Sequence, residues 1–344
     1  MTVFNFTVRA TDDQGAFADR EFSIKIRNTI VDRYMMVNGT DAYTSPDGTN
    51  WTKRVTSGGS SVTYGAGKWL VVKSASQYLL SVDGINFTPH TFPPSSVVPA
   101  VQYVNGRFVY AARYVNEPYR MHYSYDGINW TVTEGAMALS TEYQPTSFIY
   151  VDGRWIAAAN GSYNYCAKYS DDDGATWHPI YTGYTFACSG IAYYNGLYIA
   201  IDNSAKGSAA RVLTSNDTVV WTPRSLPPSA IPNYYGASEI LYGNGRLVMP
   251  IYKTASSGTN GVFWVVTSVD GINWEVKTYP PFVSNGNAVH AKVSSTYHNG
   301  LFMLVCTHNA GGAGGIRVSE DGVTWETVAP SLGVMNGIAG LSYG

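Results

Sequence analysis

A short motif recurs seven times along this chain of 344 residues, and this repetition constrains the fold more than any other feature. In each copy a Ser is followed two residues later by an Asp, and an aromatic residue ends the motif four residues after the Asp, or five in one copy. The copies span residues 45–51, 81–87, 124–130, 170–177, 215–221, 268–274 and 319–325. Because successive aromatics lie about 36 to 53 residues apart, the spacing is typical of repeat architectures and of β-propellers in particular.

A second repeated pattern lies between the copies of this Ser-x-Asp motif. Six segments have the form strand, two-residue turn and strand, as in YVNGRFVYA from Tyr103. The turn is Asn-Gly in four of them and Asp-Gly or Ala-Gly in the others, which is a strong short-range signal for a β-hairpin. Each repeat therefore predicts four antiparallel strands, named A to D, in which A and B form the hairpin, C enters the motif and D leaves its aromatic. Four such strands in about 45 residues form one propeller blade.

The two ends of the chain supply the blade that six hairpins and seven motifs leave incomplete. The segment GIAGLSYG (337–344) has the sequence of a strand A, and VDRYMMV (31–37) has the sequence of the strand B that follows such a turn. We therefore expect strand A of the last blade to come from the C-terminal end and strands B, C and D from residues 33–56. This closure pairs strands that are distant in sequence and removes exposed sheet edges.

Residues 1–28 precede the propeller and alternate apolar and polar residues in two segments, FNFTVRA (4–10) and DREFSIKI (19–26). The alternation predicts a β-hairpin. It resembles the last two strands of cadherin-like or immunoglobulin-like repeats, which implies a fragment of a β-sandwich. A lone hairpin is marginally stable in water, so its apolar face needs a partner. Either the chain is part of a longer protein, which we favour, or the hairpin packs against the propeller or another subunit. The prediction is thus an all-β chain with a hairpin at 1–28 and a seven-bladed β-propeller, closed by strands from both chain ends, at 29–344.

The repeated motif resembles the Asp-box, or bacterial neuraminidase repeat, of a family of β-propellers. One copy, 170–177, has the family's longer pattern Ser-x-Asp-x-Gly-x-Thr-Trp, and the other copies are mostly shortened to Ser-x-Asp-Gly-x-x-Trp. The shortened form, together with the Asn-Gly-Arg hairpins, resembles propellers of bacteriophage tail-fibre and receptor-binding proteins. The resemblance implies that the motif is the turn between strands C and D at the periphery of each blade.

The motif residues have a structural and a functional interpretation. Asp and Ser side chains accept hydrogen bonds from turn amides, Gly allows a positive φ, and Trp packs between strands. The alternative makes the acids metal ligands or catalytic groups. Because a catalytic residue is needed once and a turn in every blade, repetition favours the structural role. The motif residues are Asp47, Asp83, Asp126, Asp172, Asp217, Asp270 and Asp321, with Trp51, Trp130, Trp177, Trp221, Trp274 and Trp325.

The composition excludes several classes of function. Only 13% of the residues are charged and the net charge is −2, with no Lys or Arg cluster that could neutralise several phosphates, so we expect no nucleic-acid partner. No apolar run approaches the roughly 18 residues of a membrane span, and the N-terminus lacks a signal-peptide pattern. The three cysteines, Cys166, Cys188 and Cys306, lack metal-ligand spacing, so neither a metal nor another cofactor is predicted. The sequence leaves two states open: a disulfide between Cys166 and Cys188, or three free thiols.

Strand direction predicts two unlike faces. The A–B and C–D turns form one, here the turn face, and the B–C and D–A loops form the other, here the loop face. The B–C loops expected at 110–121, 158–165, 201–211, 252–261 and 306–315, and the D–A loops expected at 133–145, 180–190, 224–238 and 278–291, are long and unequal, as in many binding surfaces. They are rich in Tyr, Ser, Gly and Asn, which suit adaptable recognition, although Tyr could instead pack between blades. The candidate ligand-binding residues are Tyr114, Glu117, Tyr119, Arg120, Tyr143, Tyr163, Tyr184, Tyr234, Tyr235 and Glu239.

Glu239 is a candidate for a different reason. It occupies a position, three residues before the Tyr of strand A, that is a small residue in the other six blades: Ser61, Ala100, Ser147, Gly190, Ser294 and Gly340. A carboxylate near the propeller axis must be solvated or hydrogen-bonded. It therefore either contacts a ligand or is a solvated residue of the channel.

These features predict a non-enzymatic binding head of a phage tail fibre or receptor-binding protein, which recognises a bacterial surface glycan or protein through the loop face. The implied location is the virion, after assembly in the host cytoplasm. One alternative is a structural virion module that docks other fibre subunits. Another is a glycoside hydrolase, since Asp-box propellers include sialidases. However, the nearest string to the sialidase arginine motif is a poor match at Tyr119-Arg120-Met121, and the loop-face acids Glu117, Glu134, Glu142, Asp202 and Glu239 show no evident pair.

Overall fold

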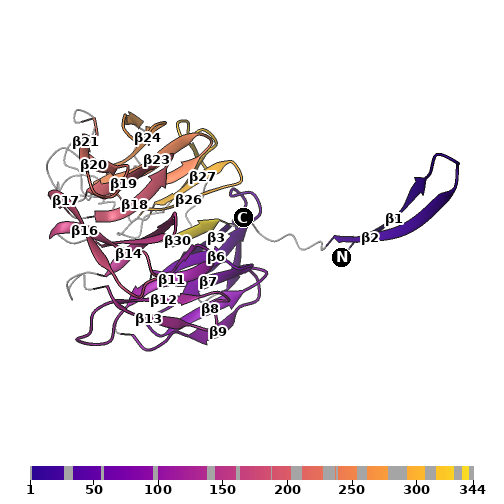
Figure 1. The fold of residues 1–344 in the computed structure, drawn as a ribbon, viewed down its shortest axis with the longest axis horizontal. Helices are drawn as coiled ribbons and strands as arrows, with labels where there is room; N and C mark the ends of the chain where they lie inside the picture. Colours follow the sequence, from indigo (N-terminus) through magenta and orange to yellow (C-terminus); the bar gives the residue numbers. More distant parts are fainter. Residues whose placement is uncertain are drawn as a thin grey trace.

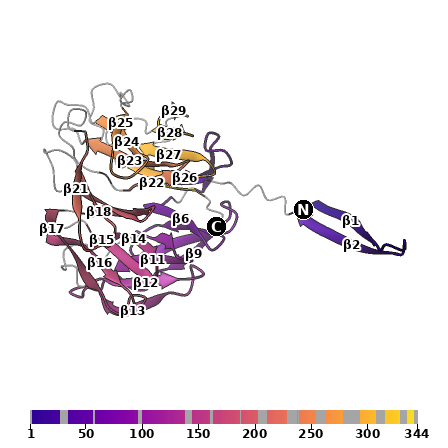
Figure 2. The same ribbon diagram turned by 45° about the horizontal axis from the view of Figure 1, so that its top comes forward.

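The computed structural model describes residues 2–26, 34–55, 58–95, 100–137, 144–159, 163–186, 188–202, 211–227, 237, 239–253, 262–277, 293–306, 315–328 and 335–340. Every regular element in these ranges is a β-strand. Seven four-stranded antiparallel sheets are arranged about a common centre, with β6, β14, β18, β26 and β30 on the inside (Figures 1 and 2). The predicted all-β, seven-bladed propeller is therefore confirmed.

Each blade follows the predicted order of strands from the centre outward. Blades 1 to 3 are β6 (Ser61–Gly65), β7 (Lys68–Val72), β8 (Gln77–Ser81) and β9 (Thr88–Thr91); β10 (Gln102–Val104), β11 (Arg107–Ala112), β12 (Arg120–Ser124) and β13 (Thr131–Ala136); and β14 (Pro145–Val151), β15 (Arg154–Ala159), β16 (Tyr163–Ser170) and β17 (His178–Phe186). Blades 4 to 6 are β18 (Cys188–Tyr194), β19 (Leu197–Asp202), β20 (Arg211–Ser215) and β21 (Thr222–Ser225); β22 (Leu241–Gly243), β23 (Arg246–Lys253), β24 (Val262–Ser268) and β25 (Glu275–Lys277); and β26 (Val293–His298), β27 (Leu301–Cys306), β28 (Gly315–Ser319) and β29 (Glu326–Thr327). Blade 7 is β30 (Met335–Gly340), β3 (Tyr34–Asn38), β4 (Ala42–Ser45) and β5 (Thr52–Val55).

Blade 7 closes the ring as the sequence predicts. Its inner strand β30 pairs with β3, with Gly340 opposite Tyr34 and Ile338 opposite Met36. Strand A thus comes from one end of the chain and strands B to D from the other (Figure 1). Closure by long-range pairing leaves no open blade at either side of the ring.

The hairpin turns between strands A and B have the geometry that their sequences predict. All six have positive φ at both turn residues, as at Asn105 (50°) and Gly106 (73°) or Ala66 (47°) and Gly67 (72°). Two consecutive positive φ angles define the type I′ turn, whose twist matches that of paired strands.

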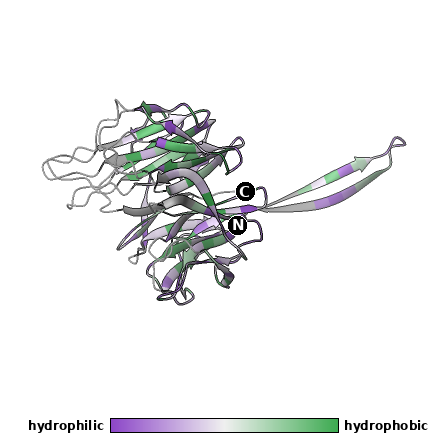
Figure 3. Cartoon of the chain, turned by 60° about the vertical axis from the view of Figure 1, so that its left-hand side comes forward, coloured by the Kyte–Doolittle hydropathy of each residue, from purple (hydrophilic) through white to green (hydrophobic). Residues whose placement is uncertain are grey.

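The apolar core lies between adjacent blades. One cluster joins Ile199 and Val212 of blade 4 to Met249 and Trp264 of blade 5. Another joins Met35 of blade 7 to Trp69 of blade 1, so the closing blade packs in the same way as the others. Apolar residues follow the strands and polar residues gather at the turns (Figure 3). Each blade thus buries its faces against its neighbours, which makes the ring a rigid support for its loops.

One predicted loop is wrong. Residues 180–190 were expected to form a D–A loop, but β17 extends to Phe186 and β18 begins at Cys188. Pairs such as Tyr165 with Tyr181 and Tyr163 with Phe186 continue the ladder across bulges. The sequence did not reveal this because the segment mixes Tyr and Thr, which favour strands, with Gly183, which looked like a turn residue.

The N-terminal residues form a separate two-stranded sheet, β1 (Thr2–Thr11) and β2 (Phe17–Ile26), as predicted. The register places Phe6 and Val8 on one face, where both are exposed, and Arg9 pairs with Asp19 on the other. Residues 27–33, which connect this sheet to the propeller, lie outside the described part of the chain.

Candidate functional site: the loop face and the blade seams

Much of the loop face lies outside the described residues, including 138–143, 160–162, 203–210, 228–236, 254–261, 278–292, 307–314 and 329–334. Three predicted residues, Tyr143, Tyr234 and Tyr235, are among them, and of Tyr163 only the backbone is described. The described part brings together two groups of predicted residues and one isolated acid, Glu239.

The first group is the turn between β11 and β12 of blade 2. The Glu117 amide donates to the Tyr114 carbonyl at 3.1 Å, and Asn116 has a φ of 67°. This turn leaves Tyr114 44% exposed and Val115 74% exposed. Glu117 is exposed as well, so the tip of the turn presents an aromatic, an aliphatic and a carboxylate side by side.

Tyr119 is not part of this surface, contrary to the prediction. It is only 3% exposed and belongs to the core between blades 2 and 3, where the Arg113 guanidinium lies 4.8 Å from its ring centre. Alternation along β12 explains the error, since Tyr119 and Met121 point inward and Arg120 between them is half-buried. Arg120 donates to the Glu134 carbonyl at 2.9 Å. Tyr119 and Met121 therefore belong to the core between blades 2 and 3, and Arg120 bonds to the neighbouring strand.

The second group lies where blades 3 and 4 meet. Tyr184, on β17, is 37% exposed, and the Arg211 guanidinium lies 6.0 Å from its ring centre. Arg211 forms an ion pair with Asp202, its cross-strand partner on β19, and Asp202 is fully buried. A buried carboxylate fixes the guanidinium through charge-assisted hydrogen bonds. Sequence reasoning found Tyr184 and noted Asp202 but missed Arg211, whose position opposite Asp202 follows only from the ladder register.

Cys188 lies behind this group. It is free and buried, and its thiol donates to the Gly190 carbonyl at 3.4 Å. The bridge between Cys188 and Cys166 that the sequence left open is therefore not formed. The thiol behaves as a small apolar side chain in the core of blades 3 and 4.

Glu239 is half-buried beside the inner strand of blade 6. Its Oε1 accepts the Ser295 N–H at 2.7 Å. Burial raises the pKa of Glu239 to about 7, although the hydroxyl and N–H of Ser295 act in the opposite direction. Gln102 makes an equivalent contact in blade 2, where its Oε1 accepts the Phe148 N–H at 2.7 Å. Both side chains therefore satisfy an unpaired amide on the edge of an inner strand, so Glu239 is a hydrogen-bonded residue rather than a freely solvated one.

The seven motif acids act as turn staples. In each copy the Ser hydroxyl donates to the Asp carboxylate at 2.8 to 3.0 Å, and that carboxylate also accepts backbone N–H groups of its own turn. At Asp172, hydrogen bonds from the Thr176 hydroxyl and amide hold the pKa at about 2. No group of three or more His, Cys, Asp or Glu that could hold a metal occurs among the described residues.

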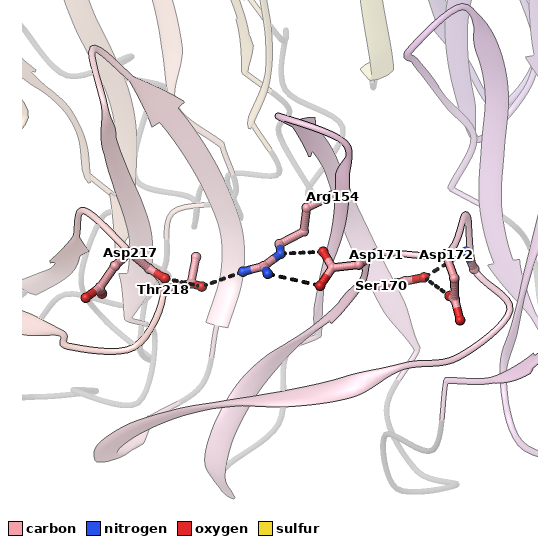
Figure 4. Close-up of polar contacts among 7 residues, drawn as sticks. Arg154, Ser170, Asp171, Asp172, Asp217 and Thr218 are labelled. Atoms are coloured by element: carbon pink, nitrogen blue, oxygen red, sulfur yellow. Dashed lines mark hydrogen bonds and ion pairs between the residues drawn. The ribbon is translucent and has the colours of Figure 1, made fainter.

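Basic residues that open strand B reach across the blade seams, which the sequence did not reveal. Lys68 of blade 1 donates to the Asp126 carbonyl of blade 2 at 2.7 Å, and Arg107 of blade 2 pairs with Asp173 of blade 3. Arg154 of blade 3 joins Asp171 of its own motif to the Thr218 hydroxyl of blade 4 (Figure 4). In these three blades the basic residue that follows the turn glycine therefore makes a contact with the next blade.

Within the described residues, no helix is long and apolar enough to cross a membrane.

No protein-family model and no curated protein sequence matches this chain. Solved structures share its fold at low identity. YCF48 from Cyanidioschyzon merolae is 13% identical, covers 83% of this chain and 92% of its own, and has a TM-score of 0.57. The structure of YCF48 bound to D1 peptide is 13% identical, covers 90% of this chain and 96% of its own, and has a TM-score of 0.53. A quinonprotein alcohol dehydrogenase-like protein from Bacteroides thetaiotaomicron is 10% identical, covers 99% of this chain and 85% of its own, and has a TM-score of 0.57. At 10 to 13% identity, these similarities show that the chain shares the β-propeller fold.

Proposed function

We propose that this chain is a non-enzymatic binding head of a phage tail fibre or receptor-binding protein, and that its loop face recognises a bacterial surface glycan or protein. The observation that carries the proposal is the pair of ordered groups on that face. Tyr114 with Glu117 and Tyr184 with Arg211 present exposed rings beside charged groups, on strands fixed by the ladders of blades 2, 3 and 4.

The chemistry of these groups suits a saccharide. An exposed ring offers a flat apolar face that can stack on a sugar ring, and neighbouring carboxylate and guanidinium groups can bind its hydroxyls. Because Asp202 already holds Arg211, the guanidinium is positioned before a ligand arrives, which lowers the entropic cost of binding. Several such heads on one fibre would reach high avidity through weak single sites.

The acids of this face support a role without catalysis. Two-carboxylate glycoside hydrolysis needs an acid and a base or nucleophile on either side of one bond. Among the described residues, Glu117 lies on an exposed turn of blade 2, Asp202 is ion-paired and Glu239 is bonded to Ser295. Glycoside hydrolysis remains the alternative that product analysis addresses.

A structural module that docks other virion subunits is the second candidate. The N-terminal hairpin favours it, because its exposed Phe6 and Val8 would be covered by a partner sheet in a longer fibre protein. On this view the loop face would contact protein rather than glycan.

Binding to glycan arrays and to intact bacteria tests the proposal, with product analysis on every glycan that binds. Tyr184→Ala and Tyr114→Ala should each weaken binding about tenfold, since loss of one stacked ring costs about 1.5 kcal/mol. Tyr125→Ala is the matched control, because Tyr125 is 60% exposed but lies on the turn face. Equal loss in the control, or release of cleaved glycan, would contradict the proposal. Absence of any binding would favour the structural module.

A further inference from the structure

A cavity of 630 Å³ opens on the turn face, at the seam between blades 6 and 7. This volume lies within the range of about 300 to 1,000 Å³ typical of ligand pockets. Four carboxylates line it, and no Lys or Arg is among its described lining residues. The acids are Asp47, Glu320, Asp321 and Glu326.

The seam between blades 3 and 4 shows what an equivalent position normally contains. There Arg154, the first residue of β15, binds Asp171 through two nitrogens at 2.7 and 3.0 Å and donates to Thr218 of the next blade at 3.1 Å. Its guanidinium also lies 4.3 Å from the ring centre of Tyr169. The guanidinium thus fills the space between the motif of its own blade and that of the next.

Of the three partners of Arg154, only Asp171 keeps its chemistry at the seam of blades 6 and 7, where a carboxylate, Glu320, takes its place; Val318 stands where Tyr169 does in blade 3. Counting from the conserved turn and motif positions within the repeat, Glu320 corresponds to Asp171 and Gly48 corresponds to Thr218. The residue that corresponds to Arg154 is Leu301, and its Cδ2 atom would lie 3.2 Å from a Cβ added at Gly48. Asp47 already accepts hydrogen bonds within its own turn, from the Ser45 hydroxyl and the Asn50 side chain. Glu320 is therefore the carboxylate that lacks the cation its counterpart has in blade 3, because Leu301 cannot neutralise it and no Lys or Arg is among the described lining residues.

The seam between blades 4 and 5 also lacks a basic residue on strand B, but there another strand supplies the cation. Between blades 4 and 5 the corresponding residue is Leu197, and the cavity there is 230 Å³. Arg224 of strand D lines that cavity and donates to Thr214 at 3.2 Å, so a cation is supplied from the other side. In blade 6 the position of Arg224 is occupied by Val328. Among the described cavities of this kind, the one at blades 6 and 7 is the one without a cation from either strand.

We propose that this cavity binds the arginine side chain of a basic peptide segment in a partner protein, with the guanidinium placed between Glu320 and the motif of blade 7. The lining suits that side chain along its length. Leu301, Val318 and Val328 would contact the methylene stem, and Glu320, Glu326 and Asp47 would bind the planar head. Because the site lies on the turn face, it is a separate interaction surface from the loop face, and the proposal does not depend on glycan recognition.

Titration with N-acetyl-arginine methylamide tests this site, with the citrulline analogue as a neutral ligand of the same shape. We expect saturable binding in the millimolar range for the arginine compound and at least tenfold weaker binding for the citrulline compound, followed by calorimetry or NMR. Glu320→Gln and Glu326→Gln should each weaken binding about threefold, in line with exposed ion pairs. Glu134→Gln, an exposed acid elsewhere on blade 2, should have no effect.

Leu301→Arg should abolish binding, because the introduced guanidinium would occupy the cavity as Arg154 does in blade 3. Equal affinity for the two ligands, unchanged affinity in the Glu320→Gln/Glu326→Gln double variant, or full binding by folded Leu301→Arg would each overturn the proposal. If Leu301→Arg fails to fold, the Gln variants decide the question alone. Failure here would leave loop-face binding intact, so the two proposals are distinguished by the same set of variants.

Discussion

At the scale of single residues, the buried guanidinium of Arg107 shows what a seam contact contributes to stability. Arg107 is 6% exposed, donates to both oxygens of Asp173 at 2.8 and 3.0 Å, and lies 5.1 Å from the Trp155 ring centre. We expect Arg107→Ala to lower the free energy of unfolding by about 2 kcal/mol, through lost packing and cation–π contact. Asp173→Asn should cost about 0.5 kcal/mol, because this carboxylate is largely exposed. Denaturant unfolding measures the loss of unfolding free energy in each variant. A larger loss for Asp173→Asn than for Arg107→Ala would contradict this prediction.

Glu239 gives a prediction about pH at the same scale. Its folded pKa, about 7, is raised above the ordinary value of 4.5, so the folded state holds the proton more tightly than the unfolded state does. Its contribution to stability is therefore present below pH 4.5 and is lost as the pH rises to 7, by at most about 3 kcal/mol. Glu239→Gln should remove this dependence of the unfolding free energy on pH. The Gln side chain should still accept the Ser295 N–H, as Gln102 accepts the Phe148 N–H. Unfolding curves of both proteins from pH 5 to 8 are the measurement, and parallel curves would refute the assignment.

At the scale of elements, the Ser-x-Asp turn is constrained by the blade that precedes it. Gly271 has a φ of 74°, and a Cβ there would lie 2.7 Å from Ile199 Cδ1 of blade 4. Gly245, in the hairpin turn of the same blade, has the same φ of 74° but nothing within 4 Å. Both Ala variants carry the left-handed backbone penalty of about 1 kcal/mol. We expect Gly271→Ala to lose about 1 to 2 kcal/mol more than Gly245→Ala in thermal unfolding, and equal losses would show that the seam yields to the extra methyl group.

At the scale of the whole molecule, stability depends on closure of the ring. Removal of residues 335–344 would delete β30 and leave β3 without its inner partner. We expect this truncation to abolish the single cooperative transition, because both neighbouring blades pack against β30. Removal of residues 1–28 should leave the propeller's melting temperature unchanged, since β1 and β2 form their own sheet. Calorimetry of the two truncated proteins makes the comparison, and a cooperative transition without β30 would contradict it.

The blade count, the two-residue hairpins, the motif turns and the closing pair of strands all followed from the sequence. Each of these follows from hydrogen bonds and φ angles within a few residues, or from repetition that makes one blade a template for the next. Four findings needed the three-dimensional arrangement: Tyr119 is buried, Glu239 binds Ser295, Arg211 pairs with Asp202, and Leu301 lines a cavity at the position where Arg154 supplies a guanidinium in blade 3. These contacts join residues on different strands or blades, such as Arg154 and Thr218, which are 64 positions apart. Their partners are set by register and by packing between neighbouring blades, which no local pattern records.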